Sequence, residues 1–133
     1  MLGNLFKKQK PAKPELNFIQ NYKNKDLFFI RTNPWGWLNK EEIYLPKNVD
    51  GKPTMITFDF WSQEIYLDAT GQITVRELIE IACKQYNDSG MDIPEGIDQI
   101  LVESLESLVY ELKVVEFSEI KRQLPKDIEE PIA

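Results

Sequence analysis

The chain has 133 residues, a length typical of one domain that buries a core without disulfide bonds or structural metals. Its apolar runs all fall short of the roughly 20 residues of a membrane-spanning helix, so we expect no membrane span. The N-terminal sequence lacks the apolar core of a signal peptide and Cys83 is the only cysteine, which together predict a cytoplasmic protein.

Charge is unevenly distributed along the chain. Residues 1–25 contain six lysines and one acidic residue, a net charge of +5, whereas residues 26–133 contain 10 basic and 21 acidic residues, a net charge of -11. An acidic domain repels phosphate backbones, so we do not expect nucleic acid as the partner. Residues 1–15 are expected to form a flexible basic arm, either solvated or in contact with an acidic or membrane surface.

The ordered domain is expected over residues 16–117, starting with one helical turn and three strands. Aromatic and branched residues predict the first strand at 27–31. A second short strand is predicted at 42–45, ended by Pro46 and followed by a hairpin turn at Asp50-Gly51.

The third strand is predicted at residues 54–58. Its side chains alternate, with Ile56 and Phe58 on one face and Met55 and Thr57 on the other. This is the clearest strand pattern in the sequence.

Two capped helices are predicted next. Asp59 is a suitable N-cap for a helix over residues 60–67. Gly71 can supply the positive φ that ends this helix, and Thr74 with Glu77 forms a capping-box pattern that opens a second helix. The two short helices are therefore expected to meet at a fixed angle.

A third helix is predicted from Pro94 to Leu112, because apolar residues keep a 3.6-residue period over nearly five turns. Residues 114–117 predict a closing edge strand. The acidic segment 118–133, with Pro125 and Pro131, is expected to fray. These elements together predict an α+β fold of the winged helix-turn-helix type, with a three-stranded antiparallel β-ribbon followed by three helices.

The residue types needed for common catalytic chemistry are scarce. The chain has no histidine, and Cys83 alone provides neither a thiolate cluster nor a Cys/His pair. Its six glycines stand singly in turns and near the termini instead of forming a phosphate-binding loop. We therefore expect a protein that is not an enzyme and that uses no cofactor and no metal.

Residues 58–65 (FDFWSQEI) and 70–78 (TGQITVREL) resemble the PqqD-like family of small winged-helix peptide chaperones. In that family a capped helix is followed by an Asp-Gly turn and a Thr-Val-x-Glu-Leu sequence. The resemblance covers about residues 54–117. It departs from the family at Thr70, where Asp is usual, and at Asp68, where an apolar residue is usual.

The resemblance implies a recognition element for precursor peptides, which presents an extended peptide to a modifying enzyme. Such modules bind the peptide as an added strand beside the third strand and against the third helix. Val102 and Val109 lie seven residues apart beside Tyr110, which supplies an apolar stripe on the expected helix. The implied peptide-binding residues are Met55, Ile56, Thr57, Phe58, Val102, Glu106, Val109 and Tyr110.

Other interpretations stay open from the sequence. The stripe on the third helix can instead pack against the N-terminal segment of the same chain or against a second copy, which would make the protein a structural or assembly component. A DNA-binding regulator is the third alternative. Trp35 and Trp37 are expected either to cap the core or to occlude or reshape the groove.

Overall fold

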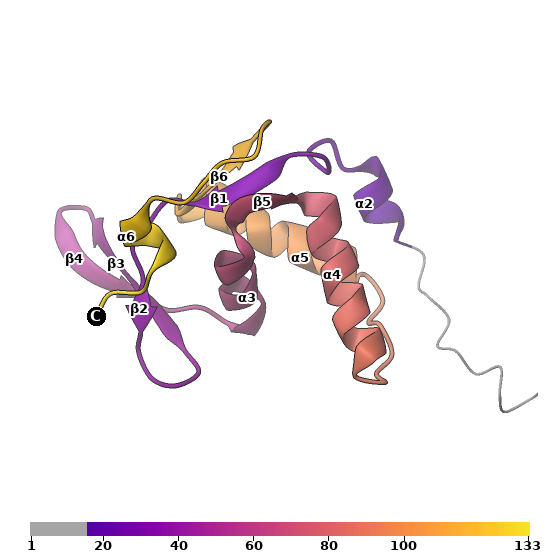
Figure 1. Ribbon diagram of the computed structural model, residues 1–133, viewed down its shortest axis with the longest axis horizontal. Coiled ribbons are helices and arrows are strands. Elements are labelled where there is room, and N and C mark those ends of the chain that lie inside the picture. Colours follow the sequence, from indigo (N-terminus) through magenta and orange to yellow (C-terminus); the bar gives the residue numbers. More distant parts are fainter. Residues whose placement is uncertain (1–15) are drawn as a thin grey trace, which may run out of the picture.

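Two small antiparallel sheets and several helices form an α+β fold in the computed structural model (Figure 1). The structure describes residues 16–133, so the expected basic arm at 1–15 lies outside the described residues. Within the described range, every helix is too short or too polar to cross a membrane.

The helices and strands have the following bounds. The helices are α2 Asn17–Asn21, α3 Phe60–Asp68, α4 Val75–Asp88, α5 Ile97–Glu106, the π-helix η1 Ser107–Glu111, and α6 Lys126–Glu129. The strands are β1 Phe28–Arg31, β2 Gly36–Trp37, β3 Ile43–Val49, β4 Lys52–Ile56, β5 Thr70–Thr74 and β6 Val115–Ser118.

The first sheet has β1 at its centre, between β5 and β6. Both pairings are antiparallel, with Phe28 opposite Ser118 and Arg31 opposite Val115 on the β6 side. The closing strand expected at residues 114–117 is therefore present as β6, one residue later. The order differs from the expected ribbon of three consecutive strands, because β1 pairs with strands that lie after α3 and after η1.

The second sheet has the order β2-β3-β4. The hairpin turn between β3 and β4 is confirmed, with Asp50 and Gly51 at φ values of 52° and 76°. Pro46 was expected to end the second strand, but it lies inside β3. It is tolerated there because β2 pairs only with Ile43 and Tyr44, so that β3 has β4 as its only neighbour at Pro46.

Both α3 and α4 begin at a predicted cap, and a strand lies between the two helices. Asp59 caps α3 through a 2.8 Å bond from the Ser62 amide, and Thr74 forms a capping box with Glu77 at the start of α4, so both predicted caps are confirmed. Gly71 does adopt a positive φ of 81°. However, it does not end α3, which finishes at Asp68; it lies within β5, whose pairing with β1 the sequence did not predict.

The third long helix is shorter and less regular than expected. α5 begins at Ile97 after Gly96 in a left-handed conformation, so Pro94 precedes the helix instead of opening it. After Glu106 the chain continues as a π-helix, in which the Leu112 amide bonds to the Ser107 carbonyl at 3.0 Å. The wider turn changes the direction of the side chains that follow it.

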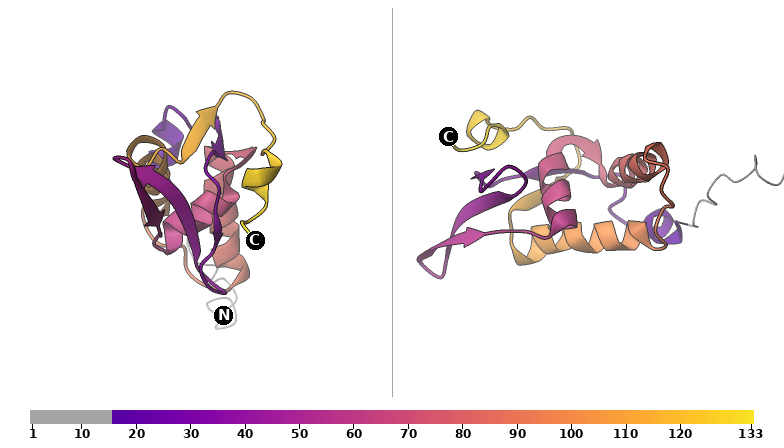
Figure 2. Two further views of the ribbon diagram at one scale, coloured as in Figure 1. Left: turned by 90° about the vertical axis from the view of Figure 1, so that its left-hand side faces the viewer. Right: turned by 90° about the horizontal axis from the view of Figure 1, so that it is seen from below.

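The core lies where α3, α4 and the first sheet pack together over α5. Figure 2 shows α3 crossing α5, which matches the contacts between these helices. The buried core residues of these elements, of η1 and of the segment before β6 include Phe29, Ile65, Tyr66, Val75, Ile97, Leu101, Leu105, Leu108 and Val114. One hydrophobic cluster therefore includes residues from α2 to β6.

The C-terminal segment, expected to fray, is held against the domain. The Trp35 indole donates to the Ile128 carbonyl at 2.8 Å, and the Ile132 amide donates to the Trp35 carbonyl at 2.8 Å. Ile132 also forms a parallel bridge with Gly36 of β2. The expectation was wrong because these partners lie about a hundred residues earlier in the sequence and leave no local pattern.

Candidate functional site

The four predicted strand residues lie at the end of β4 and just beyond it. β4 is the last strand of its sheet, so one of its edges carries no other strand of the described chain. Met55 is 57% exposed and Thr57 is exposed, whereas Ile56 is half-buried opposite Leu45. Phe58 follows the strand and packs against the ring of Tyr66, with 5.6 Å between centroids. β4 ends at Ile56, so the predicted strand extended two residues too far.

The Val102 side of α5 is covered by the chain itself. Val102 is completely buried, and the Tyr22 hydroxyl after α2 donates to a Glu106 carboxylate oxygen at 3.2 Å. The Ile19 amide of α2 donates to the Asp98 carboxylate at 3.0 Å. Burial, more than the negative charge of Glu106, raises the pKa of Tyr22 to about 12. These two predicted residues are thus in contact with an N-terminal segment instead of an open groove.

Val109 and Tyr110 lie in η1 and face β6. The ring of Tyr110 lies 6.2 Å from that of Phe117, and both predicted residues line a shallow surface cavity with Val115 and Phe117. Residues of β4 do not line this cavity. The structure therefore places the eight predicted residues in three places: the β4 edge, the α2–α5 contact and the η1–β6 surface.

The tryptophan pair lies on the other side of the second sheet. Trp35 is buried and contacts the C-terminal segment, while Trp37 in β2 is 47% exposed. The two rings meet edge to face at 5.6 Å. Because β3 lies between β2 and β4, neither tryptophan covers the free edge of β4.

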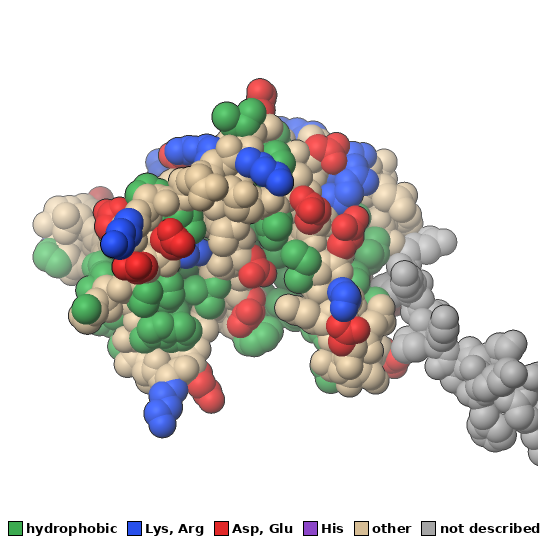
Figure 3. Space-filling view, in the orientation of Figure 1, with side chains coloured by type: hydrophobic (Ala, Val, Ile, Leu, Met, Phe, Trp, Pro, Cys, Tyr) green, Lys and Arg blue, Asp and Glu red, His purple; other side chains and the backbone are tan. Residues whose placement is uncertain are grey.

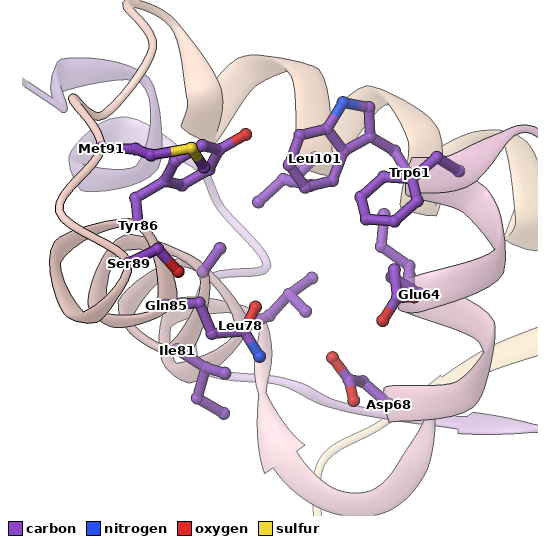
Figure 4. Close-up of a pocket in the computed structure, with 13 residues that line it drawn as sticks. Trp61, Glu64, Asp68, Leu78, Ile81, Gln85, Tyr86, Ser89, Met91 and Leu101 are labelled. Atoms are coloured by element: carbon purple, nitrogen blue, oxygen red, sulfur yellow. The ribbon is translucent and has the colours of Figure 1, made fainter.

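A cavity of about 240 Å³ opens between α3 and α4 (Figure 4). The sequence did not predict it, because its walls come from two helices whose relative placement no local pattern gives. Figure 3 shows hydrophobic and acidic side chains next to each other over this region. The lining residues are Phe60, Trp61, Glu64, Ile65, Asp68, Leu78, Ile81, Ala82, Gln85, Tyr86, Ser89, Met91 and Leu101.

Among residues 16–133, Glu64 and Asp68 are the only charged residues that line this cavity. Both come from α3, one turn apart, and their carboxylates point toward α4 (Figure 4). Burial raises the pKa of Asp68, and the negative charge of Glu64 raises it further, while the Arg31 guanidinium opposes the shift. The cavity thus combines an apolar surface with an electronegative end.

Arg31 is a buried cation that the sequence analysis did not identify as important. It is 5% exposed, and its guanidinium donates to the carbonyls of Leu67 at 2.9 Å, and of Ile128 and Glu129 at 3.3 Å each. The Leu67 carbonyl belongs to the last turn of α3, where a positive charge is favourable. Burial lowers the pKa of Arg31. The only feature of the sequence that could have indicated a buried Arg31 is its position at the end of an apolar strand.

Arg31 also joins an aromatic cluster. Its guanidinium lies 5.5 Å from the ring centre of Trp35 and 5.9 Å from that of Tyr66. The Tyr66 hydroxyl donates to the Asn33 carbonyl, and burial raises the pKa of Tyr66. This site has all its polar groups paired within the chain, which indicates a structural role.

Among residues 16–133, no group of three or more His, Cys, Asp or Glu side chains is placed to hold a metal ion. Comparisons of the chain with protein-family models, with curated proteins and with solved structures find no match. The PqqD-like resemblance stays a prediction, and the function has to be argued from the surfaces described above.

Proposed function

We propose that this domain is a non-enzymatic binding module that captures an extended peptide or protein segment by strand addition to β4. One observation carries the proposal: β4 ends its sheet, so its outer edge has no strand partner within the described chain. In strand addition, backbone hydrogen bonds provide affinity and alternate side chains provide selectivity. The exposed Met55 and the half-buried Phe58 next to this edge supply the apolar contacts.

The direction of the backbone groups in β4 supports the proposal. Met55 is opposite Pro46, which has no N–H, so this pair cannot exchange both ladder hydrogen bonds. In an antiparallel pair, residues at such positions direct their N–H and C=O groups away from the partner strand. The Met55 amide therefore faces the free edge, where an added strand would meet it.

A PqqD-like winged helix is the fold-level part of this proposal. Its support is the order of α3, β5, α4 and α5, with two capped helices meeting at β5 and a third helix packed beneath them. A precursor peptide, presented to its modifying enzyme, is the partner that the resemblance implies. Since Val102 is buried and Glu106 contacts Tyr22, the proposal relies on the β4 edge and not on the predicted helix wall.

The decisive test is an NMR titration of the isotopically labelled full chain with precursor peptides encoded by neighbouring genes. We expect amide shifts concentrated in residues 52–58. Met55→Pro removes the outward N–H without removing a bond to β3, so it should abolish binding, whereas Met55→Ala keeps the N–H and should bind. Unchanged spectra in residues 52–58 on saturation with each peptide, or equal binding by both variants, would contradict strand addition.

A second candidate function is that of a structural or assembly component. The observation that favours it is the contact of α2 with α5 through Asp98 and Glu106, since the chain's own N-terminal segment then occupies the helix surface on which a peptide was expected. A second copy could occupy remaining surfaces in the same way. Analytical ultracentrifugation at high protein concentration tests self-assembly, and sedimentation as a monomer alone would exclude it.

A further inference from the structure

The cavity between α3 and α4, called the groove from here on, has large apolar side chains exposed at its rim. Phe60 is 66% exposed, Met91 52% and Ile81 37%, and all three line the groove. Below this rim, Trp61 and Tyr86 face each other from opposite walls with 6.2 Å between ring centroids (Figure 4). Aromatic and methionine side chains gathered around a hollow are typical of a surface that binds another chain.

The size of the groove limits what can enter it. An apolar cavity of about 150 Å³ holds a benzene ring. The groove, with a cavity volume of about 240 Å³, therefore fits one phenylalanine or leucine side chain together with part of a neighbouring side chain. Its open side admits an extended segment.

The charge at one end of the groove is not balanced by the residues that line it. Glu64 and Asp68 form a like-charge i,i+4 pair, an arrangement that destabilises a helix. Within residues 16–133, neither the Glu64 carboxylate nor the Asp68 carboxylate accepts a side-chain hydrogen bond or forms an ion pair. Arg31, the cation that acts on Asp68, already donates to backbone carbonyls on the other side of α3. A cation supplied by a ligand would relieve the repulsion between the two carboxylates.

We propose that this groove binds a protein segment in which an apolar side chain is followed directly by lysine or arginine. The apolar side chain enters the groove beside the paired rings of Trp61 and Tyr86, and the cation lies between Glu64 and Asp68. The charge of the groove selects this chemistry, because the part of its lining that belongs to residues 16–133 has two acidic residues and no basic one. The proposal does not depend on strand addition at β4, which lies on a different part of the molecule.

Two blocked peptides test the proposal on the full chain: fluorescein-labelled Gly-Leu-Phe-Lys-Lys-Gly, and the same peptide with glutamates in place of lysines. Fluorescence anisotropy should show binding of the lysine peptide only, weakened by added salt. The double substitution Glu64→Gln and Asp68→Asn should weaken binding by about tenfold, since each partly exposed charge pair contributes up to about 1 kcal/mol. Glu80→Gln, an exposed acidic position of α4 outside the groove, is the matched control.

Equal binding of both peptides, or equal binding by the double variant and the Glu80→Gln control, would overturn the proposal. Met55→Pro should leave this binding unchanged, which separates the groove from the β4 edge. The chain's own Phe6, Lys7 and Lys8 have the chemistry that the groove selects. If Lys7→Glu with Lys8→Glu strengthens binding of the peptide about tenfold, the occupant is the chain's own arm, and the assignment to a partner is wrong.

Discussion

Helix α3 has two sides that carry charge in opposite ways. On one side, the buried Arg31 guanidinium bonds to the Leu67 carbonyl and to two carbonyls of the C-terminal segment. On the other side, Glu64 and Asp68 project into the groove toward α4, and the described residues that line the groove include no cation. We call these the closed side and the open side.

The difference between them separates the side of α3 that holds the fold together from the side that we propose as a binding surface. A buried charge is tolerated only when its hydrogen-bonding capacity is met, and carbonyls of two segments, α3 and the C-terminal segment, accept the hydrogen bonds of Arg31. On the open side the two carboxylates are partly exposed and keep access to water, so they need no salt-bridge partner within residues 16–133. The closed side should therefore be sensitive to substitution, and the open side should be tolerant or even stabilised.

The largest effect is expected for Arg31→Ala. This substitution removes the Arg31 donor from the carbonyls of Leu67 and Glu129, and it leaves the Ile128 carbonyl with the Trp35 indole as its donor. It should lower the free energy of unfolding by about 3 kcal/mol. Urea denaturation measures the loss. Arg31→Lys should fall between wild type and Arg31→Ala, because a single ammonium cannot replace the planar guanidinium. A loss below about 1 kcal/mol for Arg31→Ala would mean that the closed side contributes little.

Gly71→Ala tests the close approach of the C-terminal segment to β5. Gly71 has a φ of 81°, and a Cβ there would overlap the carbonyl oxygen of Arg122. Gly51→Ala is the matched control, since Gly51 has a φ of 76° and open space around it. Thermal unfolding should show a loss of about 1 kcal/mol at Gly51 and at least about 2 kcal/mol at Gly71. Equal losses would contradict the packing of Arg122 on β5.

Trp35→Phe removes one hydrogen bond from the closed side while keeping an aromatic ring. The indole no longer donates to the Ile128 carbonyl, so we expect a loss of about 1 kcal/mol in the free energy of unfolding. Trp37→Phe is the control, because Trp37 is 47% exposed. Chemical denaturation followed by circular dichroism compares the two, and an equal effect of both would argue against the bond to Ile128.

Asp68→Asn probes the open side and should stabilise the domain slightly, by a few tenths of a kcal/mol at pH 7. The pKa of Asp68 is raised in the folded state, so its ionisation opposes folding. Stability is therefore lost as the pH rises through the folded pKa, and the gain from Asn should disappear below the unfolded pKa of about 3.9. Urea denaturation of both proteins tests this: Asp68→Asn should be more stable than wild type at pH 7 and equally stable at pH 3. A destabilised variant at pH 7 would mean that Asp68 is paired within the chain.

Local chemistry made part of this fold predictable. The Asp59 cap, the Thr74–Glu77 capping box and the Asp50-Gly51 hairpin each depend on residues at most three positions apart, and all three are present. The strand at residues 27–31 and the closing strand after η1 followed from apolar composition, with bounds shifted by one residue.

Long-range contacts explain what the sequence analysis missed. β5 is a strand because β1 pairs with it, although the same residues between two helices resemble a simple turn. Val102 belongs to an apolar stripe that α2 covers, and a seven-residue spacing cannot show which element lies on it. The groove between α3 and α4 was not predicted, because Glu64 and Asp68 look like solvated helix positions until α4 is placed opposite them.

The hydrogen bonds of Arg31 also affect the order of folding. Two of them, to the carbonyls of Ile128 and Glu129, join residues 97 and 98 positions apart, and closing loops of that length is entropically costly. The closed side should consequently form after the helical unit of α3, β5 and α4, whose contacts are short-range. Substitutions at Arg31 would then act mainly by accelerating unfolding and would leave the refolding rate nearly unchanged. The contacts of Arg31 with the C-terminal segment should therefore determine how slowly the native state unfolds.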